Sequence, residues 1–470
     1  MGKPRLRRED IMNIARSKPL IALLLTAAMA VIVSADEKPN IVFIMADDLG
    51  YGDLGCYGQE RIKTPNLDRM AAEGMRFTQH YSGSTVCAPS RCALMTGMHT
   101  GHAAIRDNEG GFGARPLGPS DVTVAEVLKQ AGYATAIVGK WDSAGPDGTG
   151  IPNRHGFDYS FGYLHSSRAH NYYPEFLWRD GQKVILEGNR NGQGTQYSHD
   201  MFTREALAYI ERNKDRSFFL YLAYTLPHAE LAVPEDSQKP YLGKFPERPF
   251  KRPASWEWRP GRYRPQENPK AAFAGMVSRM DRDIGRLLTK LEEVGLDHNT
   301  LVMFASDNGA HIEGGADPGF FGGSGPLRGV KRDLYEGGIR VPFIAHWPGK
   351  INAGSISDHV SAFWDFLPTC AELAGADAPE AIDGLSMVPS LLGQPREQEE
   401  HEFLYWEFKD KQAVRMGDWK AVRLGGENGS LELYNLKRDI GEKDDLSKRH
   451  PEIIARIKKI LKESRDVPRN

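Results

Sequence analysis

Cysteine is scarce in this sequence: Cys56, Cys87, Cys92 and Cys370 are the only four among 470 residues. A small disulfide scaffold needs a much denser set, so the sequence excludes that class of protein. An excess of charge of one sign is also lacking, because 60 lysines and arginines face 62 aspartates and glutamates. With a formal net charge of -2, nothing global in the sequence indicates nucleic acid as a partner.

Long apolar runs are lacking too, apart from one near the N-terminus. Residues 20–33 form a run that is too short to span a bilayer comfortably, and no second apolar span follows. A basic segment precedes this run, and Val33-Ser34-Ala35 ends it. This order is typical of a secretory signal peptide; a membrane anchor is the alternative. We expect cleavage after Ala35, a secreted or periplasmic protein, and no membrane anchor in the mature chain.

Short apolar runs recur along the rest of the chain and are typical of buried parallel strands. They cover residues 40–45, 134–138, 218–224, 301–304 and 342–346. Helical patterns lie between them, the longest over 269–294, where apolar residues recur at helical spacing. Strands that alternate with helices predict an α/β fold, with a mostly parallel sheet covered by helices on both faces.

The composition changes after about Gly375. Short alternating segments follow, and the sequence ends in a helical pattern over 451–464. This order predicts a smaller antiparallel α+β subdomain. We therefore expect three parts: a signal peptide over 1–35, a main domain over 36–375 and a subdomain over 376–470.

Acidic and amide side chains follow two of the predicted strands. Asp47 and Asp48 come after the first strand, and Asp307 and Asn308 come after the strand over 301–304. Ligands of open α/β sheets bind beyond the carboxyl ends of the strands. Three carboxylates and an amide there suit Ca²⁺, with Mg²⁺ as a second possibility. Either pair alone could equally cap a helix or form a turn; the two together favour a metal site.

Cys87 lies at the start of a predicted helix, because Pro89 suits the first turn of a helix. A helix N-terminus favours an anion, and Arg91 lies on the same face, four residues on. A thiolate nucleophile of lowered pKa is one interpretation. Soft sulfur is a poor partner for a hard cation, however, and the conflict disappears if oxygen replaces the sulfur. Cys92 lies about 140° further round the helix and is expected to pack in the core.

The stretch Cys87-Ala88-Pro89-Ser90-Arg91, followed by Leu94-Met95-Thr96-Gly97, resembles the signature of the type I sulfatases. Further segments occur in the order of that family: Asp47-Asp48-Leu49-Gly50, Gly139-Lys140-Trp141, Asp307-Asn308-Gly309, Lys331 with Tyr335-Glu336-Gly337-Gly338, and Glu432-Leu433-Tyr434-Asn435-Leu436. The resemblance covers almost all of the mature chain and implies an alkaline-phosphatase-like fold. It also implies that a formylglycine-generating maturation enzyme converts Cys87 to Cα-formylglycine (3-oxoalanine).

The resemblance implies a role for each remaining member of the site. Asp47, Asp48, Asp307 and Asn308 would hold Ca²⁺ together with an oxygen of residue 87. One hydroxyl of the hydrated aldehyde would attack sulfur and expel the alcohol, and elimination of inorganic sulfate would regenerate the aldehyde. Arg91, Lys140 and Lys331 would stabilise the hydrate and the sulfate charge. His228 would protonate the leaving oxygen.

One position departs from the pattern of the family. Asp142 follows Lys140-Trp141, where the family usually has a histidine. A carboxylate there could accept a proton from the hydrate, but it would also repel sulfate. Alternatively, Asp142 points away and His170 or His311 takes its place. The sequence leaves these alternatives open.

The leading hypothesis is a calcium-dependent sulfuric ester hydrolase that removes ester sulfate from a sulfated saccharide. A phosphate or phosphonate ester hydrolase of the same superfamily is the nearest alternative. A sulfated-glycan-binding protein without turnover, favoured by Asp142, and a metal-free cysteine hydrolase are the others. Arginines and aromatic residues over 244–265 fit either a glycan-binding loop or an ordinary surface loop.

Overall fold

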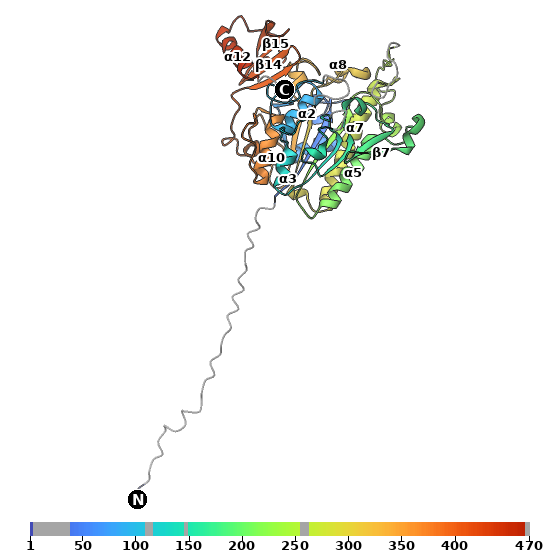
Figure 1. The fold of residues 1–470 in the computed structure, drawn as a ribbon, viewed down its shortest axis with the longest axis vertical. Coiled ribbons are helices and arrows are strands. Elements are labelled where there is room, and N and C mark those ends of the chain that lie inside the picture. Colours follow the sequence, from blue (N-terminus) through green and yellow to red (C-terminus); the bar gives the residue numbers. More distant parts are fainter. Residues whose placement is uncertain (3–37, 109–115, 145–148, 254–262, 466–470) are drawn as a thin grey trace. The chain divides into compact units, whose positions relative to one another are not determined.

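The computed structural model describes residues 1–2, 38–108, 116–144, 149–253 and 263–465 (Figure 1). Apart from its first two residues, the predicted signal peptide lies outside the described residues. Residues 38–470 form one compact unit, to which the description below refers. None of the described helices has the length and apolarity needed to cross a bilayer.

A ten-stranded sheet forms the centre of this unit, in the order β11-β2-β10-β9-β1-β8-β4-β5-β6-β7. Its strands are β1 (Asn40–Asp47), β2 (Met75–Phe77), β4 (Ala134–Lys140), β5 (Tyr159–Tyr163), β6 (Phe176–Arg179), β7 (Gln182–Ile185), β8 (Phe218–Pro227), β9 (Thr300–Ser306), β10 (Phe343–His346) and β11 (Ser355–Ser357). The five strands from β9 to β5 are parallel to one another. The prediction of a mostly parallel sheet is confirmed.

The strand predicted over 342–346 is present as β10, but it pairs antiparallel with both β9 and β2. The prediction of a parallel strand was wrong at this position. A continuous apolar run indicates that both faces of a strand are buried, and it carries no information on the direction of the chain.

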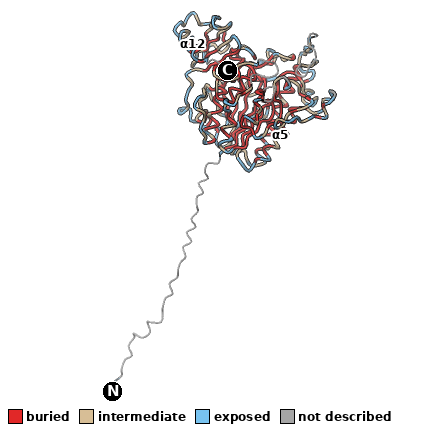
Figure 2. The backbone as a smooth tube through the Cα atoms, viewed as in Figure 1, coloured by how far each residue is buried: buried red, intermediate tan, exposed pale blue. Residues whose placement is uncertain are grey.

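Helices cover both faces of the sheet. Successive side chains of a strand point to opposite faces, so each central strand contributes to the core on either side. Val42 and Ile44 of β1 pack with α1 (Pro65–Glu73), α5 (Ser198–Asn213) and α7 (Pro269–Glu293). Ile41 and Phe43 pack on the other face with α2 (Cys87–Thr96), α3 (Val124–Gln130) and α10 (Phe366–Ala374). Cys92 belongs to this second core, as predicted. The buried backbone of the central strands is visible in Figure 2.

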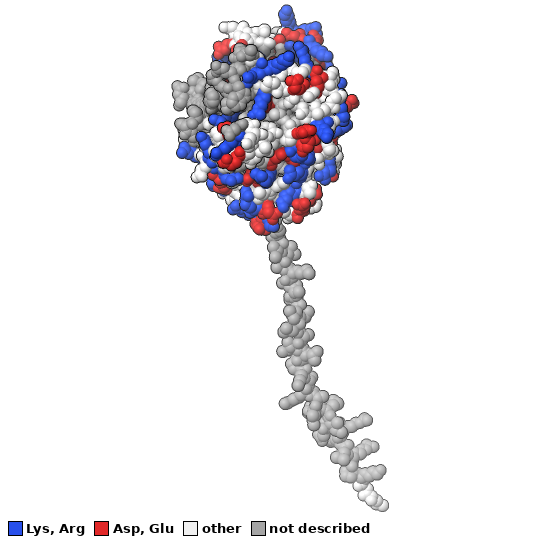
Figure 3. Space-filling view, turned by 90° about the vertical axis from the view of Figure 1, so that its right-hand side faces the viewer, with Lys and Arg blue, Asp and Glu red and all other residues white. Residues whose placement is uncertain are grey.

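Shorter elements complete the main domain. They are β3 (His80–Tyr81), which pairs with β12 (Ser361–Ala362), and the helices α4 (Ser166–Ala169), α6 (Glu235–Gln238), α8 (Pro318–Phe321), α9 (Glu336–Ile339) and α11 (Val388–Leu391). On the face shown in Figure 3, acidic and basic side chains are intermingled. This surface agrees with the small net charge of the sequence.

The C-terminal part contains a four-stranded antiparallel sheet and one helix, as predicted. The strands are β13 (Leu404–Phe408), β14 (Lys411–Met416), β15 (Trp419–Leu424) and β16 (Ser430–Asn435), followed by α12 (Pro451–Glu463). In Figure 1, β14, β15 and α12 lie together, away from α3 and α5. The boundary that we propose for this subdomain falls at Gly375, the residue that caps α10.

A buried ion-pair network connects the C-terminal sheet to the main domain. Lys420 of β15 is fully buried, and its Nζ donates to Glu336 Oε1 at 2.9 Å and to Glu442 Oε1 at 3.1 Å. Glu336 begins α9 and also accepts a hydrogen bond from the Tyr81 hydroxyl at 2.6 Å. Both carboxylates therefore share one lysine, and Glu336 also pairs with Arg340 at 3.2 Å.

Lys420→Met is expected to lower the free energy of unfolding by about 3–5 kcal/mol, because it leaves two buried carboxylates without their shared cation. Chemical denaturation would measure the change. Lys459→Met is the control, because Lys459 lies on the exposed face of α12 and its pair with Glu463 spans 4.0 Å. It should change stability by less than about 1 kcal/mol. Equal stabilities of the two variants would contradict the importance of the network.

Candidate active site

The carboxyl ends of β1 and β9 bring the predicted acidic residues together. These strands are parallel neighbours with Ala46 opposite Ser306, so Asp47, Asp48 and Asp307 emerge at the same edge. The backbone N–H of Asp48 donates to Asp307 Oδ1 at 3.0 Å. Asp48 itself has a left-handed φ of 68°, which a short polar residue tolerates better than most.

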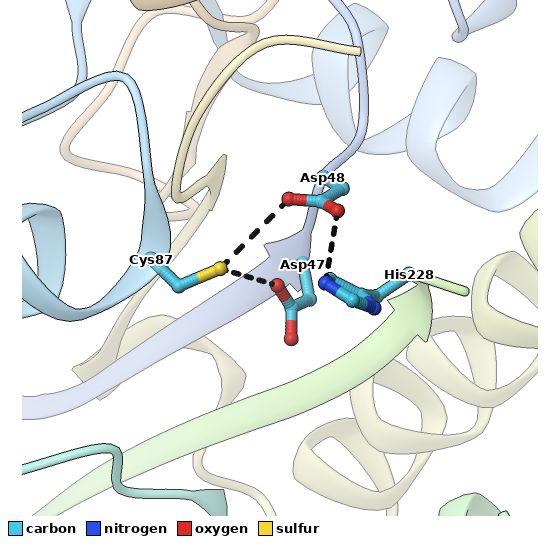
Figure 4. A group of neighbouring side chains, drawn as sticks. All are labelled: Asp47, Asp48, Cys87 and His228. Atoms are coloured by element: carbon cyan, nitrogen blue, oxygen red, sulfur yellow. Dashed lines mark hydrogen bonds and ion pairs between the residues drawn. The ribbon is translucent and has the colours of Figure 1, made fainter. Parts of the chain in front are cut away.

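Cys87 is the first residue of α2 and faces these carboxylates (Figure 4). Its Sγ lies 3.3 Å from Asp47 Oδ1 and 3.9 Å from Asp48 Oδ1. Burial and the charge of Asp47 raise the pKa of this thiol well above its usual value. The interpretation of Cys87 as a thiolate of lowered pKa was therefore wrong, because burial, and after it the charge of Asp47, disfavours the thiolate. A metal-free cysteine hydrolase loses its support.

Arg91 lies one turn further along α2, and it is buried. Its Nε and Nη2 donate to Asp307 Oδ2 at 3.0 and 2.7 Å, and its Nη1 donates to the Lys140 carbonyl oxygen at 3.0 Å. Burial and the charge of Asp47 raise the pKa of Asp307 to about 7, although Arg91 acts in the opposite direction. Arg91 thus ties α2 to the ends of β4 and β9.

Two lysines each donate a hydrogen bond to one of the paired aspartates, Asp47 and Asp48. Lys140, the last residue of β4, donates to Asp47 Oδ2 at 2.9 Å. Lys331 donates to Asp48 Oδ2 at 2.7 Å and lies 3.8 Å from Cys87 Sγ. Burial raises the pKa of Asp47, but the cations around it, led by Lys140, bring the net value well below the usual one. Asp47 is therefore ionised.

His228 follows the cis-proline end of β8 and contacts both Asp48 and Lys331. Its Nε2 lies 3.2 Å from Asp48 Oδ2 and 3.1 Å from Lys331 Nζ. Burial lowers the pKa of His228 to about 4, although Asp48 opposes this shift. Its imidazole is consequently neutral near pH 7 in the protein without a bound ion.

The donor atoms of the cluster fit a metal ion. Asp47, Asp48, Cys87 and His228 each offer one ligand atom, and these atoms lie within 4.8 Å of one another. Asn308 is also buried there, and its Nδ2 donates to Asp48 Oδ1 at 2.8 Å. Its Oδ1 accepts no hydrogen bond from any described residue. A buried amide oxygen of this kind requires a partner, and a cation would supply one.

Asp142 does not point away from the site. It is buried, and its Oδ2 lies 3.4 Å from Lys140 Nζ, while its Oδ1 accepts a hydrogen bond from the Ser166 hydroxyl. Ser166 was not predicted, because no motif marks it. This orientation contradicts the alternative in which Asp142 points away and His170 or His311 takes its place.

His170 and His311 lie on either side of His228. The ring of His170 stacks on that of His228, with centroids 4.3 Å apart and an angle of 11°. The ring of His311 lies 5.8 Å from the other side. His311 Nε2 is 3.1 Å from the Pro227 carbonyl oxygen, and its Nδ1 is 3.2 Å from Glu313 Oε2, a residue that the sequence did not indicate. His311 therefore supports His228, and both of its nitrogens already have partners.

Part of the arginine- and aromatic-rich loop also reaches the site. Residues 254–262 lie outside the described residues, but Tyr263 packs against His170, with ring centroids 5.8 Å apart. Arg264 lies beside Glu230, with Nε 3.6 Å from Oε1. An aromatic and a basic side chain thus border the histidines.

All twelve residues predicted for the site lie together at this edge of the sheet. The family model described as Sulfatase matches residues 39–376. The chain belongs to the sulfatase family. A second model, described as N-sulphoglucosamine sulphohydrolase, C-terminal, matches residues 330–467. This sulfatase is therefore a sulfuric ester hydrolase with an alkaline-phosphatase-like fold.

A known arylsulfatase and several solved structures match the chain over most of its length. Arylsulfatase A of Homo sapiens is 35% identical over 428 residues, which cover 84% of this chain and 77% of the relative. The crystal structure of Ps i-CgsB in complex with k-i-k-neocarrahexaose is 30% identical, with a TM-score of 0.76, and the match covers 92% of this chain and 94% of that one. The phosphonate monoester hydrolase of Agrobacterium radiobacter shares the fold, at 20% identity, a TM-score of 0.66 and coverage of 90% and 95%.

Proposed function

We propose that this sulfatase removes ester sulfate from a sulfated carbohydrate, with Cys87 matured to Cα-formylglycine and with a bound Ca²⁺ ion. The observation that carries the proposal is the position of Cys87. Its Sγ lies 3.3 Å from Asp47 Oδ1, at the start of α2, among three buried cations. A protonated thiol is a weak nucleophile there, and a formylglycine hydrate would present oxygen to sulfur instead.

The chemistry of the donor set favours a hard cation. Asp47, Asp48, Asp307 and Asn308 would hold the ion through carboxylate and amide oxygens, which suit Ca²⁺ best and Mg²⁺ second. When bound, the ion would add positive charge for the sulfate group. The unpartnered Oδ1 of Asn308 supports this assignment.

The charges of the site fit a sulfate ester better than a phosphate monoester. Arg91, Lys140 and Lys331 provide three positive charges, against the carboxylates of Asp47, Asp48, Asp142 and Asp307. With all four carboxylates ionised, a divalent ion would leave this set with a single positive charge. A sulfate ester carries one negative charge, so the buried site would become neutral when it binds; a phosphate monoester dianion would leave it negative.

We assign proton transfer to the leaving oxygen to His228, with Lys331 beside it. A sugar alcohol is a poor leaving group and needs a proton, whereas fixed cations can stabilise the sulfate charge. His228 Nε2 lies 3.1 Å from Lys331 Nζ. Burial lowers the pKa of Lys331, but the charge of Asp48 raises it, and the net value lies above the usual one. Lys331 therefore stays charged. Because His228 itself is neutral, the ammonium group of Lys331 would supply the proton that His228 passes to the leaving oxygen.

Three observations support a saccharide substrate. Ps i-CgsB was solved with a neocarrahexaose, and the C-terminal family model is that of an N-sulphoglucosamine sulphohydrolase. Tyr263 and His170 place aromatic rings beside His228, where a sugar could pack. We further propose that the protein is exported through its N-terminal signal peptide and matured by a formylglycine-generating enzyme.

Protein made with the maturation enzyme is expected to lose the thiol mass of Cys87 in favour of an aldehyde or its hydrate, as measured by peptide mass spectrometry. The same protein should release sulfate from sulfated saccharides. It should hydrolyse a nitrophenyl sulfate at least about tenfold faster than the matching phosphate, in line with the charge balance of the site. An unmodified Cys87, or a preference for phosphate or phosphonate, would contradict the proposal; tight binding without release would favour a glycan-binding protein.

A further inference from the structure

We propose that Asp142 is a positioning residue that holds Lys140 while Asp47 binds the metal ion, and that it thereby leaves Asp47 free to act as a ligand. The inference rests on the proposed function, because it concerns the same ion. It assigns a task to the residue at which this chain departs from the sulfatase pattern.

Lys140 and the ion would compete for the same carboxylate. Lys140 is fully buried, and a buried ammonium group needs a compensating partner. Its Nζ donates to Asp47 Oδ2 at 2.9 Å. The same Oδ2 lies 3.6 Å from Arg91 Nη2. When Asp47 turns a carboxylate oxygen to a cation, Lys140 loses part of this compensation.

One carboxylate oxygen of Asp142 has no hydrogen-bond partner among the described residues. The residue is 2% exposed, and its Oδ2 lies 3.4 Å from Lys140 Nζ. This oxygen accepts no hydrogen bond from the part of the chain that the structure describes. The second oxygen of the carboxylate is held by the Ser166 hydroxyl. Lys140 thus has a second carboxylate within ion-pair distance, and this carboxylate can accept a hydrogen bond from its ammonium group.

The backbone around Asp142 is fixed from several sides. Arg91 Nη1 donates to the Lys140 carbonyl, and the N–H of Trp141 donates to the Tyr163 carbonyl at 3.0 Å. The indole of Trp141 donates to the Gly150 carbonyl at 2.7 Å. Asp142 has a φ of 71°, a left-handed conformation that costs energy for most residues other than glycine. These contacts hold the carboxylate against Lys140.

Electrostatics agree with this geometry. Burial lowers the pKa of Lys140, but Asp142 and then Asp47 raise it well above the usual value. The contribution of Asp142 is the larger of the two. The electrostatic effect thus points to the same carboxylate as the 3.4 Å distance between Asp142 Oδ2 and Lys140 Nζ.

Asp142→Asn tests the inference, because asparagine has the same shape and tolerates a left-handed φ. Titration calorimetry of Ca²⁺ into metal-depleted protein should show an affinity at least about tenfold weaker than that of the wild type, since Lys140 would then compete for Asp47. Asp158→Asn is the matched control; it removes the partner of Lys129 in a half-exposed pair of 2.6 Å, and should change the affinity by less than about twofold.

A second pair of variants separates positioning from direct attraction of the ion. In Lys140→Met protein the competition of Lys140 for Asp47 is gone, so adding Asp142→Asn should weaken Ca²⁺ binding by no more than about twofold. Ser166→Ala keeps the charge of Asp142 but releases one oxygen, and should weaken binding by about threefold. Circular dichroism would establish that each variant is folded.

The outcomes distinguish this inference from the function on which it rests. Wild-type affinity in Asp142→Asn, or an equal weakening in the Lys140→Met background, would overturn the role of Asp142 and leave the calcium site intact. Wild-type protein that binds no Ca²⁺ would overturn both proposals. If Asp142→Asn fails to fold, wild-type affinity in folded Ser166→Ala would overturn the inference.

Discussion

Replacing Cys87 by alanine is expected to abolish sulfate release, with a loss of at least about 10⁴-fold in kcat, because alanine cannot supply the nucleophile. Sulfate released from a nitrophenyl sulfate and from a sulfated saccharide would be measured in parallel. The fold should persist, since the side chain that is removed is small and its neighbours are the polar groups of the site. The loss should be the same for both substrates.

Cys92→Ala provides the matched control on the same helix. Cys92 is fully buried in the core between the sheet and α10, and it contacts none of the acidic residues of the site in the described structure. This variant should keep its kcat within about threefold while losing about 1–2 kcal/mol of stability. Turnover in Cys87→Ala above one hundredth of the wild-type rate would contradict the role assigned to residue 87.

Replacing His228 by alanine is expected to have an effect that depends on the leaving group. For an alkyl sulfate ester of a sugar we expect a loss of about 10²–10³-fold in kcat, because the departing alkoxide needs a proton. For a nitrophenyl sulfate the loss should be less than about tenfold, because a nitrophenolate leaves without one. The comparison of kcat for the two substrates is the measurement.

The leaving-group comparison separates proton transfer from a general disturbance of the site. His228 stacks between His170 and His311, so its removal could also shift Lys331. Such a shift would reduce both activities by the same factor, which would contradict the assignment of His228 as the acid. His298→Ala is the control, because that histidine is 77% exposed and lies outside the site; it should leave both rates unchanged.

Much of the site could be predicted from the sequence, because its parts follow strand ends and one long motif. Asp47, Asp48, Asp307 and Asn308 come after strands whose apolar runs are unmistakable, and the carboxyl ends of parallel strands meet at one edge. Cys87 and Arg91 are one helical turn apart, so their shared face followed from helix geometry. The direction of β10 could not be predicted, because burial patterns do not encode it.

The partners of these residues were beyond the sequence. Ser166 lies on a short helix after β5, and Glu313 lies in the segment after β9; neither stands in a motif. The pKa of Cys87 depends first on its burial and then on Asp47, a residue 40 positions away in the chain. The helix N-terminus alone indicated the opposite shift, because a local argument cannot include a charge that only folding brings near.

The sequence by itself determined the α/β architecture, the family and the identity of the residues at the site, because these depend on local periodicity and on motifs. Tertiary structure alone decided how the charges pair: Lys140 between Asp47 and Asp142, Lys331 between Asp48 and His228, and Arg91 on Asp307. It also decided that Asp142 faces inward. The direction of the Asp142 side chain depends on a backbone φ of 71° and on contacts from distant strands. Neither can be predicted from the neighbouring residues in the sequence.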